Sequence, residues 1–258
     1  MSTVFTSDPG RSIALLWGLR GPGRRGPKQK LDLADIVRAA VALADAEGLE
    51  ALSMRRVADA VGVSPMSLYT YVPSKAELID LMQHSVWGET GSPPPALTGW
   101  RPQLEFIAHQ QWDSGQRHPW MLQAAGRRPP LGPNVVAKFE AAFRAVDGLG
   151  LTDLEMEMII GLLADYVRGA ARAAQDARQV EETSGMTDAQ WLSAADGALK
   201  TVLDPGTYPV SARVGEACRI AYAAGFDPRV SFEFGLQCVL DGVAVFIASR
   251  RRPAEAAA

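Results

Sequence analysis

Cysteine and histidine are scarce in this chain of 258 residues, which has only two cysteines and three histidines. Cys218 and Cys238 lie twenty positions apart and form no CxxC pair. The spacing therefore predicts neither a zinc site nor a disulfide framework, and a reducing compartment is expected. The chain also lacks the GxSxG, HExxH and Walker A motifs, and no cluster of histidine, acid and nucleophile can be recognised. We therefore expect no enzyme activity, no catalytic residue, no metal and no cofactor.

A long apolar run is missing from the N-terminal part of the chain. The longest early run covers residues 13–17, far fewer than the roughly 18 residues that a membrane span needs. No small-residue cleavage pattern follows it, so no signal peptide is expected. Hydrophobic residues make up 47% of the chain and charged residues 21%, which allows a substantial core without disulfide or metal cross-links. We expect a soluble cytoplasmic protein with no membrane partner.

The positive charge is concentrated near the N-terminus. Five cations and no acid occur between Arg20 and Lys30, among glycines and prolines. This pattern indicates a flexible basic arm over residues 1–30 that contacts the DNA backbone. The arm's cationic residues are Arg24, Arg25, Lys28 and Lys30. A solvated, disordered tail is the alternative. The arm also contains a formal GxGxxG match, but no strand precedes it, so no dinucleotide site is predicted.

Helical spacing of apolar residues dominates the rest of the sequence, and we see no convincing strand pattern. A first helix follows Asp32 and ends before Gly48, and the next three cover about 54–61, 65–72 and 75–87. After a linker at 88–95, helices are expected at about 100–116, 118–125, 134–146, 154–179, 188–199, 211–223 and 229–249. His118 is expected to cap its short helix. The fold class is all-α, with an N-terminal domain at 31–88 and a second helical domain at 96–252.

The two short helices at 54–61 and 65–72 form a helix-turn-helix, because Gly62 supplies the positive φ that the turn requires. An inward-facing Leu68 directs several neighbouring side chains outward, where they can enter a major groove and contact thymine methyls or phosphates. These residues are Pro65, Met66, Ser67, Tyr69 and Thr70. Arg55 and Lys75 are placed to bind phosphates on either side. An ordinary helical hairpin with solvated ends is the alternative.

Several segments resemble the TetR family of bacterial regulators. The resemblance rests on Ala46 to Ala58, on Gly62-Val63-Ser64 and on Leu68 to Lys75, and it covers about residues 32–88. Beyond that region, the chain resembles the C-terminal domain of the tetracycline-repressor-like branch. This second resemblance rests on residues 118–120, 130–134, 232–236 and 240–242. The resemblance implies DNA contacts from Tyr71 as well as from the residues named above. Pro65 and Met66 stand where relatives often have polar, base-reading side chains, so apolar and phosphate contacts are expected to contribute more.

The last helix is apolar on nearly every side, with only Glu233, Gln237 and Asp241 forming a narrow polar stripe. Such a helix must be buried on more than one side. The helix at 154–179 likewise carries large apolar residues, which lie beside small residues. Two helices from each chain would form a four-helix dimer interface, which the resemblance also implies, whereas a purely intrachain core is the alternative. A two-fold dimer would place two recognition helices about one DNA turn apart on a palindromic operator.

Aromatic and methionine residues gather on the helices between 100 and 166, where they suit an apolar inducer. The predicted pocket residues are Phe106, His109, Gln110, Trp112, Trp120, Met121, Phe139, Phe143 and Tyr166. For any one of them, filling a core is the more common role of such a side chain. Tetracycline-responsive relatives hold the drug and its metal with a histidine and an asparagine, but alignment on Trp100 and His118 places Gly91 and Ile107 there. Tetracycline and metal binding are therefore not expected.

These features together predict a ligand-responsive DNA-binding regulator, most plausibly a repressor. It would bind a palindromic double-stranded operator as a homodimer, and a small molecule of unknown identity would release it by favouring a second arrangement of the same dimer. The linker and the helix at 75–87 would couple the two domains. A DNA-binding protein without ligand response is one alternative, and an all-α small-molecule carrier or enzyme is another.

Overall fold

The computed structural model describes residues 8–19, 31–124, 129–222 and 226–251. These residues form α-helices and contain no strand, so the all-α prediction is confirmed. The N-terminal part comprises α1 (Pro9–Leu16), α2 (Leu33–Glu47), α3 (Met54–Ala60), α4 (Pro65–Tyr71) and α5 (Lys75–Glu89). The C-terminal part comprises α6 (Trp100–Arg117), α7 (Trp120–Ala124), α8 (Pro133–Val146), α9 (Asp153–Ser184), α10 (Asp188–Val202), α11 (Pro209–Tyr222) and α12 (Pro228–Arg251).

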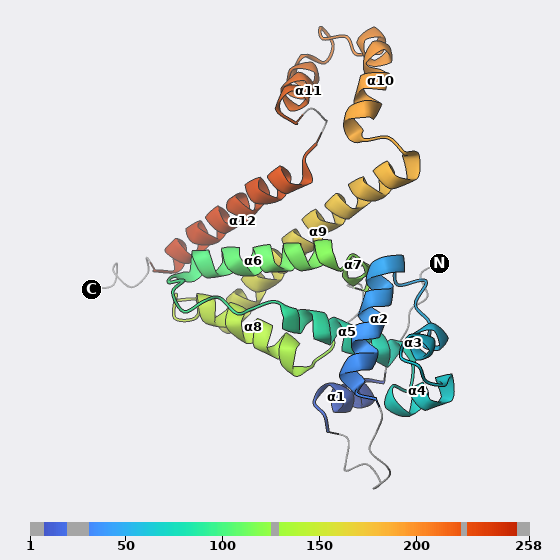
Figure 1. Cartoon of the computed structure of the whole chain (residues 1–258). Helices are drawn as coiled ribbons and strands as arrows, with labels where there is room; N and C mark the ends of the chain where they lie inside the picture. The colour runs from blue at the N-terminus through green and yellow to red at the C-terminus, as the bar shows by residue number, and fades with distance from the viewer. Residues whose placement is uncertain (1–7, 20–30, 125–128, 223–225, 252–258) are drawn as a thin grey trace, which may run out of the picture.

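Local signals determine where the N-terminal helices begin. The side chains of Asp32, Ser53, Ser64 and Ser74 each accept a hydrogen bond from a backbone N–H in the first turn of the following helix. The turn between α3 and α4 contains Gly62 at φ +70°, as the sequence predicts. These helices enclose one apolar core and leave α3 and α4 at the outer end of the molecule (Figure 1).

Helix α1 corrects the prediction of a flexible arm over residues 1–30. Asp8 caps the helix, and Leu15 and Leu16 are buried against the N-terminal core. The buried Ser12 hydroxyl donates to Asp80 Oδ2 at 2.7 Å, and Trp17 Nε1 donates to the Leu131 carbonyl at 2.8 Å. The apolar run that is too short to span a membrane therefore ends a docked helix, in which Leu15 and Leu16 are buried and Ile13 is exposed.

Helix α5 connects the two halves of the molecule. It packs against α1 and α2 on one side and α8 on the other, so residues around its whole circumference are buried. Apolar Leu78, Ile79 and Met82 are fully buried, and the polar Asp80 and Gln83 are each only 5% exposed. Leu78, Ile79 and Met82 belong to the same apolar core as Val57 of α3 and Leu68 of α4.

The C-terminal core lies among α6, α8, α9 and α12. One face of α12 enters it through Phe232, Leu236, Leu240, Val243 and Ile247. The polar stripe noted in the sequence pairs with α6: Glu233 lies 2.9 Å from His109 Nε2, while Arg101 donates to Gln237 Oε1 at 2.6 Å and to Asp241 Oδ1 at 2.7 Å. The stripe therefore aligns α12 on α6.

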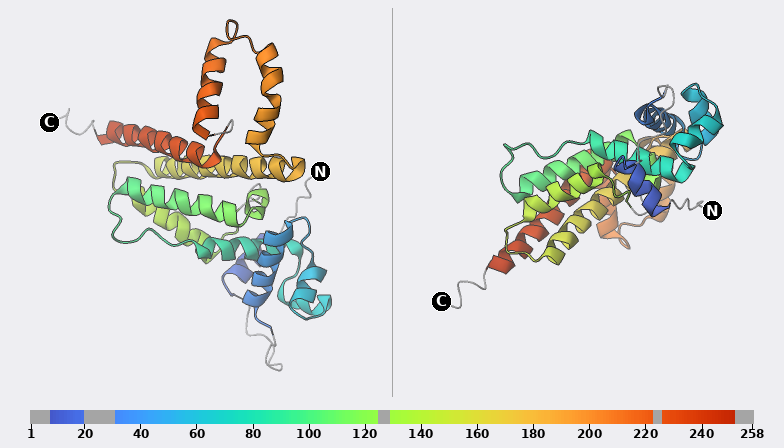
Figure 2. Two further views of the ribbon diagram at one scale, coloured as in Figure 1. Left: turned by 45° about the horizontal axis from the view of Figure 1, so that its top comes forward. Right: turned by 90° about the horizontal axis from the view of Figure 1, so that it is seen from below.

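Helix α9 extends beyond its predicted end at about residue 179. Its exposed polar turns continue to Ser184, and Gly185 ends the helix in the left-handed conformation at φ +67°. The following helices α10 and α11 form a hairpin that projects from the body of the molecule (Figures 1 and 2). Neither hairpin helix has a buried residue in the part of the chain that is described.

A partly buried polar network joins α2 to the segment between α6 and α7. Asp45 Oδ1 lies 2.8 Å from His118 Nδ1 and accepts a hydrogen bond from Trp120 Nε1 at 2.7 Å. The other ring nitrogen of His118 lies 3.0 Å from Glu89 Oε2, which also accepts from Arg117. The prediction that His118 caps its own helix is therefore wrong, because its side chain bridges two domains instead.

Candidate nucleic-acid interface and ligand cavity

The outer face of α4 presents the side chains that the sequence assigns to DNA. Leu68 is fully buried and anchors the helix, while Met66 is 77% exposed and Tyr69 is 44% exposed. Pro65, Ser67 and Thr70 are also exposed. The structure therefore brings these five predicted residues together on one surface, which offers apolar groups, a phenol and hydroxyls to a groove.

Local hydrogen bonds pre-order this surface. Ser64 Oγ accepts from the backbone N–H of Ser67 at 3.1 Å, and the two hydroxyls lie 2.9 Å apart. Thr70 Oγ1 donates to the Ser67 carbonyl at 2.6 Å. The hydroxyls are thus held close to the helix, whereas the Met66 and Tyr69 side chains extend furthest from it.

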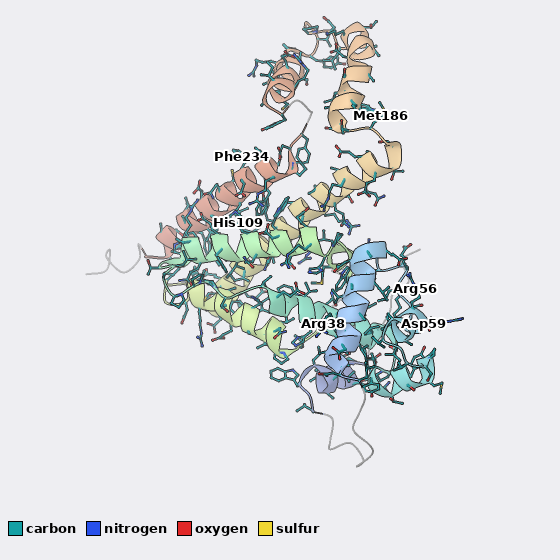
Figure 3. All side chains as sticks on the ribbon, in the orientation of Figure 1. Arg38, Arg56, Asp59, His109, Met186 and Phe234 are labelled. Atoms are coloured by element: carbon teal, nitrogen blue, oxygen red, sulfur yellow. The ribbon has the colours of Figure 1, made fainter. Side chains whose placement is uncertain are left out.

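The predicted phosphate contacts differ in accessibility. Arg55 is exposed, whereas the neighbouring Arg56 is paired with Glu47; both Arg56 and Asp59 lie on α3 at the outer end of the molecule (Figure 3). The Lys75 ammonium donates to the Leu49 carbonyl at 3.2 Å, and its partial burial lowers the pKa of Lys75. A phosphate near Lys75 would restore a favourable environment for its charge.

Two further predictions for the interface have different outcomes. Tyr71 is partly buried and packs against the N-terminal core, so it is less accessible than Tyr69. Arg24, Arg25, Lys28 and Lys30 of the basic arm lie outside the described residues.

A cavity of about 290 Å³ lies beside α5 and is lined from α5, α6, α8 and α9. Of the nine predicted pocket residues, Gln110, Met121 and Phe139 line it. A second compartment of about 120 Å³ shares part of the same wall. Residues common to both compartments are Trp87, Thr90, Gln111, Met121, Ala164 and Arg168.

The structure corrects the pocket assignment of Trp120, Trp112, His109 and Tyr166. Trp120 is 1% exposed and belongs to the N-terminal core. The other three surround Phe232 instead: Trp112 stacks on it at 4.3 Å between ring centroids, Tyr166 stacks at 6.2 Å, and His109 meets it edge-on at 5.5 Å. Figure 3 shows His109 on α6 beside α12. These side chains therefore fill the contact between α12 and its neighbours.

Phe143 and Phe106 also fall outside the cavity lining. Phe143 packs against the C-terminal core and lies 6.0 Å from the Phe139 ring, between centroids. Phe106 is partly buried on α6. Helical spacing places both residues near the correct region, but a shift of one helical position separates a cavity wall from a packed core.

Several lining residues are not among those predicted from the sequence. These are Gln83, Trp87, Thr90, Ile107, Gln111, Lys138, Ile160, Ala164 and Arg168, together with smaller residues of the 91–142 segment. The sequence could have indicated Gln83 as a lining residue, because it is a polar residue between the inward-facing Met82 and Val86 of one helix. Its Oε1 is buried and has no hydrogen-bond partner among the described residues.

Two cations reach the cavity wall. Lys138 Nζ donates to the carbonyls of Thr90 and Gly91, the latter at 2.8 Å, and its burial lowers the pKa of Lys138. Arg168 forms a 3.1 Å ion pair with Asp165, in which both side chains are substantially exposed. No aspartate or glutamate is among the described residues that line either compartment.

Gly91 and Ile107, which alignment on Trp100 and His118 places at the drug-binding and metal-binding positions of tetracycline-responsive relatives, both line the cavity. Within the described ranges, no group of three or more histidine, cysteine or acidic side chains could hold a metal ion.

Helices α9 and α12 each present a second apolar face to the outside. Leu154, Met158 and Leu162 recur every four residues on α9 and are 52–76% exposed. Phe234 and Val245 on α12 are each 72% exposed, and Phe234 lies at the end of α12 nearest the hairpin (Figure 3). Helix α12 is the one described helix that is long and apolar enough to cross a membrane by length and composition alone. Its two apolar faces account for that composition.

Comparisons with known proteins match both parts of the chain. Residues 36–82 match the profile of the bacterial regulatory proteins of the tetR family, and residues 92–247 match the tetracyclin repressor-like C-terminal domain. The HTH-type transcriptional repressor DrrR1 of Streptomyces coeruleorubidus is 42% identical over 250 residues, which cover 96% of this chain and 90% of that protein.

Two solved structures of ActR from Streptomyces coelicolor have a similar fold. The apo form is 27% identical with a TM-score of 0.71, and the match covers 86% of this chain and 99% of that one. The form in complex with actinorhodin is 29% identical with a TM-score of 0.69, and it covers 83% of this chain and 96% of that one.

Proposed function

The chain belongs to the TetR family of bacterial regulatory proteins, and from this premise we propose that it is a ligand-responsive transcriptional repressor. It binds a palindromic operator as a homodimer, and a small molecule in the C-terminal cavity releases it. The observation that carries the proposal is the pairing of an exposed recognition surface on α4 with a cavity against α5, a helix whose buried residues share the N-terminal core with Leu68 of α4. The relatives are named as transcriptional regulators and not as enzymes.

Recognition of DNA by α4 combines apolar and backbone contacts. Met66 and Tyr69 extend toward the bases, where a methyl group or an aromatic ring can contact a thymine methyl. Arg55 and Lys75 bind the flanking phosphates, and the basic arm adds further backbone contacts. Bacterial DNA lies in the cytoplasm, which is the location that the proposal requires.

Dimer formation buries the second apolar faces of α9 and α12. Exposed apolar patches of this extent on two adjacent helices indicate an interaction site. Because α12 and α9 pack against each other, their outer faces form one continuous surface, which suits a four-helix contact with a second copy. The projecting hairpin extends this surface, since it also exposes apolar side chains, including Trp191 and Ile220.

Ligand response operates through α5. Trp87 and Gln83 of this helix line the cavity, while Leu78 and Ile79 on the same helix belong to the N-terminal core. A ligand that is accommodated best by a shifted α5 therefore favours a second position of the α3–α4 unit. A regulator without ligand response is less well supported, because the C-terminal domain contains an open cavity and is not packed throughout.

Fluorescence anisotropy tests the DNA-binding part of the proposal. Labelled DNA from just upstream of the protein's own gene is titrated with the protein at near-physiological salt, with excess nonspecific competitor. We expect competitor-resistant binding that is lost in the Arg55→Ala/Tyr69→Ala double variant, because both side chains lie on the exposed interface. Arg144→Ala is the matched control, since Arg144 is an exposed residue of α8 paired with Glu140.

Either of two results would contradict the repressor proposal. One is binding that disappears with competitor for every neighbouring intergenic region. The other is an affinity of the double variant equal to that of the unmutated chain. The carrier or enzyme interpretation would then be preferred.

A further inference from the structure

The charge of the cavity wall restricts the chemistry of the ligand. The described lining contains the two cations Lys138 and Arg168 but no carboxylate, and the remaining polar groups are amides, hydroxyls and backbone carbonyls. A cation near a low-dielectric cavity is stabilised by an anion placed within a few ångströms. The two cations therefore favour a ligand that carries a negative charge.

Lys138 has neutral partners rather than an ionic one. Its ammonium donates to the Thr90 and Gly91 carbonyls, and none of the described carboxylates forms an ion pair with it. Desolvation is the cause of its lowered pKa. The neutral carbonyls therefore offset the loss of hydration only in part, and an anionic ligand group would complete the environment of the charge.

Arg168 is positioned to contribute a second cationic contact. Its only carboxylate partner among the described residues is Asp165, one turn away on α9, and the pair is largely exposed. Such a pair contributes little to stability, so Arg168 can turn to a ligand at small cost. A guanidinium binds a carboxylate through two parallel hydrogen bonds, which an ammonium cannot do.

The rest of the wall selects for a flat apolar framework. Trp87, Phe139 and Ile107 supply aromatic and aliphatic surface beside the cations, and aromatic rings pack favourably in stacked or edge-on arrangements. We infer that the cavity binds a planar aromatic acid, whose anionic group is held by Lys138 and Arg168 and whose rings lie against Trp87 and Phe139. This inference rests on the proposed function, and it specifies the inducer class.

The buried amide of Gln83 provides a further selective group. Its Oε1 has no hydrogen-bond partner among the described residues, although the residue lines the cavity. The terminal amide torsion of glutamine is soft, so the group can turn toward a hydroxyl on the ligand. A hydroxylated aromatic acid would therefore pair its anionic group with the two cations and donate a hydrogen bond from its hydroxyl to the Gln83 amide oxygen.

Isothermal titration calorimetry with two matched probes tests the inference on the full-length protein. Anthraquinone-2-carboxylate and anthraquinone-2-carboxamide have the same rings but differ in charge. We expect the carboxylate to bind about tenfold more tightly, as a charge-assisted contact requires. The preference should fall below threefold in Lys138→Met and in Arg168→Gln. It should persist in Arg144→Gln, which removes an equivalent exposed charge outside the cavity lining.

Several outcomes overturn the inference. These are equal affinities of the two probes, a preference that survives both cavity substitutions, or binding of neither probe up to its solubility limit. Melting curves accompany each variant, and the exposed Arg168→Gln variant keeps the test decisive if Lys138→Met does not fold. Anisotropy with operator DNA is measured separately without probe. Loss of specific DNA binding with an intact carboxylate preference would contradict the repressor proposal, whereas the reverse result would contradict the ligand class alone.

Discussion

Substitution of Asp45 should expose the importance of the polar network between the two domains. One oxygen of Asp45 on α2 accepts from Trp120 Nε1 at 2.7 Å and lies 2.8 Å from His118 Nδ1. His118 is only 7% exposed and Trp120 only 1%, whereas the side chain of Asp45 is 29% exposed. Asp45→Ala therefore leaves two buried nitrogen groups without their partner.

The expected loss of stability is large for a single substitution at a partly exposed residue. Each unsatisfied buried group costs about 1–3 kcal/mol, so the two together predict a decrease of about 2–6 kcal/mol in the free energy of unfolding, and water that reaches the partly exposed position 45 keeps the decrease toward the lower end of that range. The two contacts share one oxygen and are not expected to be strictly additive. Asp45→Asn retains a carbonyl oxygen at this position, and we expect it to recover part of the loss.

Urea unfolding followed by circular dichroism measures these changes. Protomer concentration is held constant, because unfolding of a dimer depends on it. Asp35→Ala is the matched control on the same helix, since its pair with Arg38 is exposed and should change stability by less than about 1 kcal/mol. If Asp45→Ala were no less stable than Asp35→Ala, the network would not contribute as its geometry indicates.

Three further predictions concern the turn, the pH dependence of stability and the dimer. Gly62→Ala should destabilise the protein by about 1–2 kcal/mol, because φ is +70° there, whereas Gly197→Ala in an exposed helix should stabilise it by about 0.5–1 kcal/mol; urea unfolding that gives both changes the same sign would refute this. Burial lowers the pKa of His84 from its ordinary 6.5, so the unfolded state takes up more protons below that pH. Stability should therefore fall as pH decreases from 6.5, and unfolding at pH 7.5 and 5.5 should show a smaller decrease for His84→Gln. Met158→Glu and Phe234→Glu should each convert the proposed dimer to monomer in sedimentation velocity, and an unchanged dimer in both would exclude the α9–α12 face as the interface.

The local features of this fold are predictable from sequence because neighbouring residues determine them. Capping side chains such as Ser53 and Ser64 define helix starts, and Gly62 defines the turn of the helix-turn-helix. Burial of Leu68 follows from helical periodicity, and it fixes the direction of the exposed Met66 and Tyr69 side chains. The fold class and the candidate DNA-binding surface therefore depend on information within a few turns of helix.

The cavity depends on contacts between segments that are far apart in the chain. Trp112 and Phe139 are both aromatic residues on amphipathic helices, yet Trp112 stacks on Phe232 while Phe139 lines the cavity. Only the packing of α12 against α6 distinguishes the two. The same is true of α1, whose apolar run is visible in the sequence, although the partners it docks on, among them Asp80, which accepts a hydrogen bond from Ser12, are distant in the chain.

The sequence by itself determined the helices, the turn and the exposed residues of α4, because caps, periodicity and glycine conformation act over short distances. The tertiary structure alone decided that Lys138 and Arg168 line one cavity and that His118 bridges two domains. Their positions follow from how whole helices pack, since the cavity lining comes from α5 to α9 and the partners of His118 come from α2 and α5. Periodicity shows which residues face inward, but the packing of the helices determines what each of them meets.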